Sequence, residues 1–191
     1  TDFVSAIFGD SDNALSFSLT GSLFNSALGY DFGNNPNPAV FSAFPSLEFD
    51  SWMTIGMMTA NDAGALSNIG MDDAMVSFNT SGNFYIDDPI GGSWFYPGFP
   101  CGMTPVEECS NNYNAFGGVD NKVLLAQITT DGSFTGIFNV QLFVGGAQTS
   151  TVNYNGNGFS TNPDDVFGCT NMAASNYDET ATVDDFSCLL P

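Results

Sequence analysis

Acid–base chemistry in this chain would have to rest on carboxylates. The sequence contains 21 Asp and Glu residues, no histidine, and a single basic residue, Lys122. A carboxylate pair, such as Glu48, Glu107 or Glu108 with an aspartate, would suffice for glycoside hydrolysis. No motif fixes such a pair, however, and the cysteines have no neighbouring base that would activate a nucleophile. The sequence therefore predicts a protein that is not an enzyme.

The densest group of possible cation ligands lies near the end of the chain, between two cysteines. It consists of Asn176, Asp178, Asp184 and Asp185. Calcium takes six to eight oxygen ligands from carboxylates, amides and backbone carbonyls, so these residues could bind it if the loop folded back on itself. In the alternative interpretation the acids face water, and nearby aromatic residues pack on the rest of the protein. Both interpretations stay open on the residues alone.

A second candidate calcium site is formed by Asp10 and Asp12, which precede Asn13. Their oxygens alternate along the chain as in a calcium loop. The glycine and the distal glutamate of an EF-hand are missing. A solvated turn is the alternative.

Four cysteines could form covalent cross-links, and three connectivities are possible. We expect the local pairs Cys101–Cys109 and Cys169–Cys188, because each closes a short polar loop. Two disulfides indicate an oxidising compartment, hence a secreted protein that is extracellular or on the cell surface. We interpret Thr1 as the first residue of a mature chain. An isopeptide bond from Lys122 to an Asn or Asp is a further possibility, with an ordinary surface lysine as the alternative.

The net charge of −20 excludes several partners. Nucleic-acid binding needs a basic footprint, which this composition does not provide. The longest apolar stretches fall well short of the roughly 20 residues that a membrane helix needs, so no membrane insertion is expected. Self-repulsion would be relieved by salt or by bound calcium, which indicates a saline setting. The alternative is that the acidity only keeps the protein in solution.

Alternating apolar residues and frequent turn residues predict an all-β fold. Leu15, Phe17 and Leu19 share one face of a predicted strand. We expect further strands within 46–58, 91–97 and 147–159, a hairpin over 74–88, and another over 122–146 with its turn at Thr130–Ser133. This spacing is typical of an antiparallel β-sandwich or jelly roll, here over residues 1–167, followed by a small disulfide-closed acidic module over 168–191.

The terminal module resembles an acidic repeat of secreted marine-bacterial proteins. Its residues Gly168-Cys169-Thr170, Ser175-Asn176-Tyr177, Asp184-Asp185 and Ser187-Cys188 match the form G-C-T-D-P-x-A-x-N-Y-x-x-x-A-x-x-D-D-G-S-C. That repeat is similar in character to thrombospondin type 3 calcium repeats, so the resemblance implies calcium binding outside the cell. The chain departs from the form at Asn171-Met172 and at Phe186, where Asp-Pro and Gly are usual. The preceding domain is similar to secreted β domains with an "EFDSWVTIG"-like strand, matched here at Glu48–Gly56.

Taken together, these features favour a secreted structural protein that self-assembles into an extracellular filament or surface coat, with calcium bridging its acidic faces. The partner would be other copies of the same chain. The alternative is a carbohydrate-binding or adhesive module with a polysaccharide partner. Its sugar-stacking platform would be Trp94, Tyr96 and Phe99. Trp52, within a predicted strand, is expected in the core.

Overall fold

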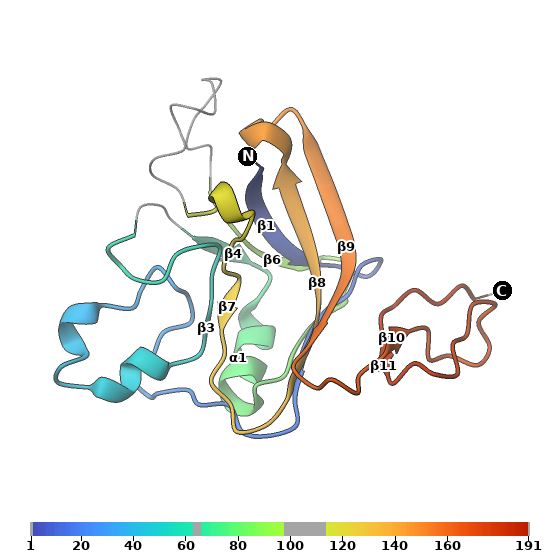
Figure 1. The fold of residues 1–191 in the computed structure, drawn as a ribbon, viewed down its shortest axis with the longest axis horizontal. Helices are drawn as coiled ribbons and strands as arrows, with labels where there is room; N and C mark the ends of the chain where they lie inside the picture. Colours follow the sequence, from blue (N-terminus) through green and yellow to red (C-terminus); the bar gives the residue numbers. More distant parts are fainter. Residues whose placement is uncertain (1, 63–65, 98–113, 191) are drawn as a thin grey trace.

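The computed structural model describes residues 2–62, 66–97 and 114–190, and most of its regular structure is β-strand (Figure 1). The strands are β1 (Phe3–Gly9), β2 (Leu15–Leu19), β3 (Trp52–Met53), β4 (Ser67–Ile69), β5 (Phe84–Ile86), β6 (Gly92–Phe95), β7 (Ala126–Gln127), β8 (Phe134–Phe143), β9 (Thr151–Ser160), β10 (Phe167–Gly168) and β11 (Val183–Asp184). The helices are α1 (Asp72–Ser81) and four 3-10 turns at Pro38–Val40, Pro45–Phe49, Gly118–Asp120 and Val144–Gly146. The all-β class is confirmed. No helix in the described ranges has the length and apolar character needed to cross a membrane.

The main sheet is antiparallel and contains seven strands. β1 and β2 lie end to end along the same side of β8, since Phe8 pairs with Asn139 and Ser16 pairs with Ile137. In the same way β6 pairs with β1 and β5 pairs with β2. Across the sheet the order is therefore β9, β8, the β1/β2 line, the β5/β6 line and finally β4 beside β6. β9 forms one edge (Figure 1).

The core lies between one face of this sheet, here called the inner face, and a thinner second layer. That layer contains α1 and the small β3–β7 sheet. Phe17, Phe134 and Phe138 of the inner face belong to the same buried cluster as Met53 and Phe78 of the second layer. Burial of such large side chains supplies most of the driving force for folding. The two layers make the architecture that of a β-sandwich.

The hairpin expected over 74–88 is wrong in its first half, which forms α1. Ala74, Met75 and Phe78 are its buried residues and share one helical face. Asp72 and the following Asp73 lie in the first turn, where negative charge favours a helix. The helix ends at Gly82, whose φ of 75° is the left-handed conformation that glycine adopts without strain. Only the second half of the segment is a strand, β5.

The hairpin expected over 122–146 is also wrong. β7 pairs with β3, whereas β8 pairs with β1, β2 and β9. The Asp-Gly pair contacts a different loop instead, because the Oδ1 of Asp131 accepts a hydrogen bond of 2.6 Å from the backbone N–H of Ser22. The true hairpin of this region is β8–β9.

The strand expected within 46–58 is reduced to the two residues of β3. The residues before it form a 3-10 turn, which Pro45 begins with its preset φ angle. Trp52, at 3% exposed, lies in the core as expected.

The last residues form a separate loop structure closed by the disulfide Cys169–Cys188, with β10 and β11 paired in parallel. It lies beside β9 (Figure 1) and packs on the outer face of the sheet. The ring of Phe186 lies 6.3 Å from the ring of Tyr85 on β5. The ring of Phe167 lies so close to Gly158 that a Cβ atom there would come within 2.6 Å of it. A larger side chain at Gly158 would therefore displace this contact.

Candidate functional site

The β8–β9 hairpin is the most unusual surface of the described chain. No Asp, Glu or Lys occurs between Gly132 and Pro163, although the whole chain carries 21 acidic residues. Nine of the ten residues of β9 are exposed. In the described part of the chain no strand pairs with β9 on its other side. Proteins usually protect such an edge with charge, proline or a covering loop, and β9 carries neither a charged residue nor a proline.

The inner face of β9 carries its apolar side chains. Directly opposite residues of an antiparallel pair share a face. Val152 pairs with Leu142 and Tyr154 pairs with Val140, both of which pack against the core. Phe159 shares this face, because its ring lies 6.0 Å from that of Phe134. Val152, Tyr154 and Phe159 are nevertheless 38%, 53% and 50% exposed, so the second layer does not extend over β9.

A β-bulge divides β9 into two halves. Two residues, Asn155 and Gly156, stand opposite the single residue Asn139 of β8. Gly156 has a φ of 67°, a conformation that glycine adopts readily, and its N–H donates to the Oδ1 of Asn139 at 2.9 Å. The buried Asn139 amide also donates to the backbone carbonyls of Phe8, Asn13 and Ala14. The bulge is thus held from the interior of the sheet.

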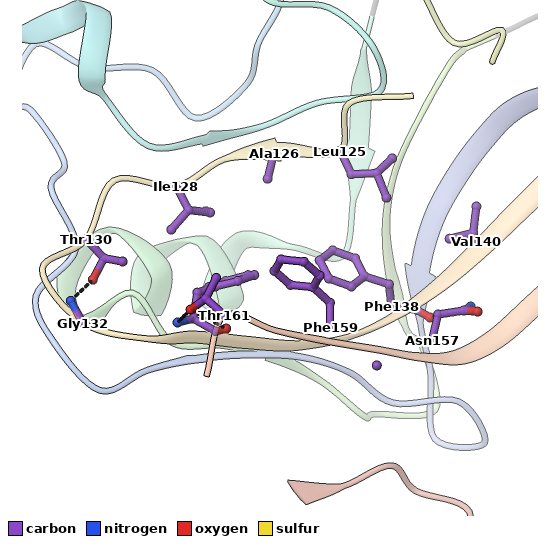
Figure 2. Close-up of a pocket in the computed structure, with 12 residues that line it drawn as sticks. Leu125, Ala126, Ile128, Thr130, Gly132, Phe138, Val140, Asn157, Phe159 and Thr161 are labelled. Carbon is purple, nitrogen blue, oxygen red and sulfur yellow. Dashed lines mark hydrogen bonds between the residues drawn. The ribbon is translucent and has the colours of Figure 1, made fainter. Parts of the chain in front are cut away.

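An apolar groove of about 590 Å³ runs between the β7 segment and the inner face of β8 and β9 (Figure 2). Its side chains come from both layers: Leu125, Ile128, Phe134, Phe138, Val140 and Phe159. The groove opens beside the free edge of β9. A strand added to β9 would therefore place every second side chain against it.

Asp165 stabilises the far end of the hairpin. Its Oδ2 accepts hydrogen bonds from Ser160 at 2.7 Å and from Thr135 at 3.0 Å, and its Oδ1 accepts one from Asn162 at 2.8 Å. The bond from Ser160, with help from those of Thr135 and Asn162, lowers the pKa of the Asp165 carboxyl against a smaller opposing effect of burial. The ionised carboxylate therefore joins β8, β9 and the start of the following loop.

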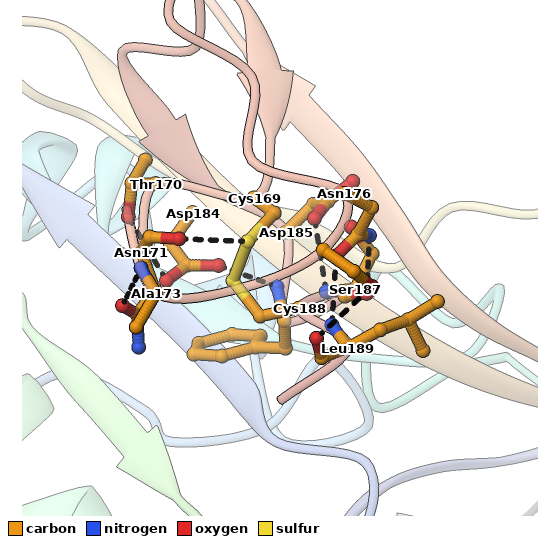
Figure 3. Close-up of a disulfide and its surroundings, with 12 residues drawn as sticks. Cys169, Thr170, Asn171, Ala173, Asn176, Asp184, Asp185, Ser187, Cys188 and Leu189 are labelled. Carbon is orange, nitrogen blue, oxygen red and sulfur yellow. Dashed lines mark hydrogen bonds between the residues drawn. A yellow bond between two sulfur atoms is a disulfide. The ribbon is translucent and has the colours of Figure 1, made fainter. Parts of the chain in front are cut away.

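The predicted calcium ligands of the terminal module organise its own turns, and Figure 3 shows three of them, Asn176, Asp184 and Asp185. Asn176 donates to the carbonyl of Ser187 at 2.8 Å and accepts from the N–H of Leu189 at 2.7 Å. Asp184 accepts from the N–H of Phe186 at 2.9 Å, and Asp185 accepts from the N–H of Ser187 at 3.0 Å. The Asn176 bonds join the middle of the disulfide loop to the residues on either side of Cys188, and the Asp184 and Asp185 bonds close tight turns just before it.

Asp178, in the loop between β10 and β11, has a similar role. Its Oδ1 accepts from the backbone N–H of Thr180 at 2.9 Å and from the hydroxyl of Thr180 at 2.7 Å. The hydroxyl bond is the main reason that the pKa of Asp178 is lowered. Within the described ranges, no three His, Cys, Asp or Glu side chains gather as a metal-binding group. Calcium binding by the module stays a prediction.

The Asp10–Asp12 segment forms a tight turn between β1 and β2. The Oδ1 of Asp10 accepts from the backbone N–H groups of Asp12 and Asn13 at 2.9 and 2.8 Å. One carboxylate oxygen thus satisfies two donors of the turn. Calcium at this position also stays a prediction.

The aromatic platform expected for a glycan is wrong for Trp94 and Tyr96, which are 0% and 8% exposed. The indole N–H of Trp94 donates to the carbonyl of Thr54 at 3.0 Å, so the ring is fixed between the two layers. A buried ring cannot stack on a sugar. Phe99 lies outside the described residues.

The cysteine predictions are confirmed in part. Cys169 and Cys188 are bonded, with their Cα atoms 4.9 Å apart. The pair Cys101–Cys109 lies outside the described residues. Lys122 is exposed, as in the surface-lysine alternative.

Comparisons with protein-family models, with curated proteins and with solved structures gave no match to this chain. The candidate site therefore rests on the geometry described above. The sequence carries one signal for this site, namely the long uncharged stretch around β8 and β9, which contains neither catalytic nor cation-binding residue types.

Proposed function

We propose that this protein is a secreted structural subunit that self-assembles into an extracellular filament or surface coat. The observation that carries the proposal is the edge of β9, which is exposed, uncharged and without a pairing strand among the residues that the structure describes. Unpaired strand edges are templates for strand addition, and backbone hydrogen bonds supply the affinity. The disulfide Cys169–Cys188 supports an oxidising, extracellular compartment.

Charge favours another copy of the chain as the partner. Each copy carries a net charge of −20, so two copies repel each other over most of their surfaces. The β8–β9 hairpin is the face on which they can approach without burying a carboxylate, which would be costly. Calcium enters the proposal as a cation that relieves the repulsion between the remaining acidic faces.

The experiment compares two variants that change the charge equally. Tyr154→Lys places a cation on the β9 edge, and Val119→Lys places one on a residue that is 96% exposed in a 3-10 turn away from the sheet edge. Sedimentation velocity and negative-stain microscopy are recorded for both variants and for the unmodified protein in calcium-containing saline buffer. We expect the unmodified protein and Val119→Lys to assemble and Tyr154→Lys to sediment as a monomer. A monomeric unmodified protein at all concentrations, or equal assembly of both variants, would overturn the proposal.

A further inference from the structure

We infer that β9 pairs antiparallel with β9 of a second copy, about a two-fold axis that passes between Asn155 and Gly156. This inference rests on the proposed function and names one contact of the assembly, since a two-fold contact joins two copies and a filament or coat needs a second contact to continue. Two-fold contacts are self-complementary, because each residue of one copy meets the symmetry-related position of the other. The strand, its bulge and its charge pattern each support this arrangement.

The bulge changes which residues of β9 share a face. In a regular strand the inner face would carry residues of one parity only. Before the bulge the inner residues are the even-numbered Val152 and Tyr154, opposite Leu142 and Val140. After the bulge they are odd-numbered, as Phe159 opposite Gly136 shows.

Because of this change of parity, two β9 strands can overlap over their full length with inner residues opposite inner residues and outer residues opposite outer ones. With the axis between Asn155 and Gly156, Val152 faces the partner's Phe159, and Thr151 faces the partner's Ser160. Both members of each pair then point to the same face, as antiparallel pairing requires. A strand without the bulge, overlapped over the same ten residues, would place inner residues opposite outer ones, and a shift by one residue would shorten the contact.

The register also covers exposed apolar surface. Val152 and Phe159 are 38% and 50% exposed in the single chain, and each would gain a cross-strand apolar neighbour. The inner faces of both copies lie on the same side of the joined sheet, so the two apolar grooves become continuous across the axis. No charged residue lies in either strand, so the pairing sets no carboxylate of one strand against the other strand.

The terminal modules limit the other ways in which two copies could contact each other at β9. Each module packs on the outer face beside Gly158, where Phe167 lies. Stacking of two outer faces over β9 is therefore obstructed, whereas pairing in the plane of the sheet leaves both modules on the outer side.

Cysteine cross-linking tests the register directly. In the variant Val152→Cys/Phe159→Cys each new thiol would face its counterpart across the axis, at the separation of directly opposed residues, which suits a disulfide. The same two positions within one chain are roughly 20 Å apart at about 3.3 Å per residue, too far to bond. The single variants Val152→Cys and Phe159→Cys are the matched controls. Both positions are exposed, and the melting temperature of each variant checks that it folds.

We expect a covalent dimer on a non-reducing gel for the double variant after mild oxidation, and none for either single variant. A covalent dimer from Val152→Cys alone or Phe159→Cys alone would indicate a parallel or shifted register and would overturn the inference. Absence of the covalent dimer in a double variant that still self-associates would also overturn it, because the copies would then associate through a different contact. If the unmodified protein does not self-associate at all, that result would instead contradict the proposed function itself.

Discussion

At the junction between the terminal module and the sheet, Phe186 combines an unfavourable backbone conformation with an aromatic contact. Phe186 has a φ of 60°, a left-handed conformation that is unfavourable for a residue with a side chain. The Phe186 ring contacts Tyr85 on the outer face of the sheet. Burial, with a contribution from Asp87, raises the pKa of Tyr85. The unfavourable backbone conformation of Phe186 thus accompanies packing of the module on the sheet.

Asp165 gives a prediction at this scale. Its pKa is lowered in the folded protein, so its hydrogen bonds stabilise the fold above the pKa of the unfolded chain, which is about 3.9, and this contribution is lost as the pH falls through the folded value. We therefore expect Asp165→Asn to lower the melting temperature at about pH 7, with the difference from the unmodified protein shrinking as the pH falls below the ordinary carboxyl value and through the lowered pKa of Asp165.

Thermal unfolding followed by circular dichroism across this pH range measures the effect. Asp164→Asn removes the same charge one residue earlier and is the control. A difference for Asp165→Asn that persists unchanged at the lowest pH would show that the hydrogen bonds do not depend on the ionised carboxylate.

Among the elements, β9 and the terminal module depend on different kinds of support. β9 is paired on one side only and is fixed by the Asn139 amide at its bulge and by Asp165 at its end. The module is closed by its disulfide and by short side-chain-to-backbone bonds such as those of Asn176. With few buried side chains of its own, the module relies on this cross-link.

Removal of the disulfide should therefore loosen the module but not the sheet. The loop between Cys169 and Cys188 has a sequence separation of 19 residues. In the chain-entropy account, closing a loop of this size contributes about 3 kcal/mol. For Cys169→Ala/Cys188→Ala we expect hydrogen exchange in residues 168–190 to accelerate roughly a hundredfold or more, as about 3 kcal/mol implies.

Hydrogen exchange followed by mass spectrometry provides its own control, because the amides of β1 and β8 are measured in the same molecule. Their protection should stay unchanged. Equal acceleration in the sheet would show that the module and the sheet unfold as one unit.

For the whole molecule, charge decides how copies meet. A net charge of −20 opposes association, while the neutral β8–β9 hairpin permits it. Added salt shortens the Debye length from about 30 Å at 0.01 M to about 8 Å at 0.15 M and so weakens the repulsion between copies.

We therefore expect self-association to strengthen as sodium chloride is raised from about 0.01 M to about 0.15 M, which is the opposite of the response of oppositely charged partners. Analytical ultracentrifugation at fixed protein concentration measures it. Calcium chloride matched to sodium chloride in ionic strength separates screening from specific binding, because only a bound ion strengthens association further and loses that effect on chelation. Association that weakens with salt would contradict an assembly of like-charged copies.

The sequence by itself determined the features that depend on composition and on near neighbours. The all-β class, the strands β2, β6 and β9, the bond between Cys169 and Cys188, and the core position of Trp52 follow from alternation, turn residues and short loop closure. Even α1 has local signals, in the acids of its first turn and in Gly82, but the alternation around Phe84 outweighed them in the prediction.

Only the tertiary structure decided what covers each surface. Alternation shows that Trp94 and Tyr154 each lie in a strand. It does not show that the second layer covers Trp94 but ends before Tyr154. Which strands pair is equally non-local. The Asp131–Gly132 turn therefore suggests a local hairpin in the sequence, whereas in the structure it contacts another loop. The free edge of β9 and its face-switching bulge depend on Asn139 of the neighbouring strand. Such contacts join residues far apart in sequence, and no local pattern records them.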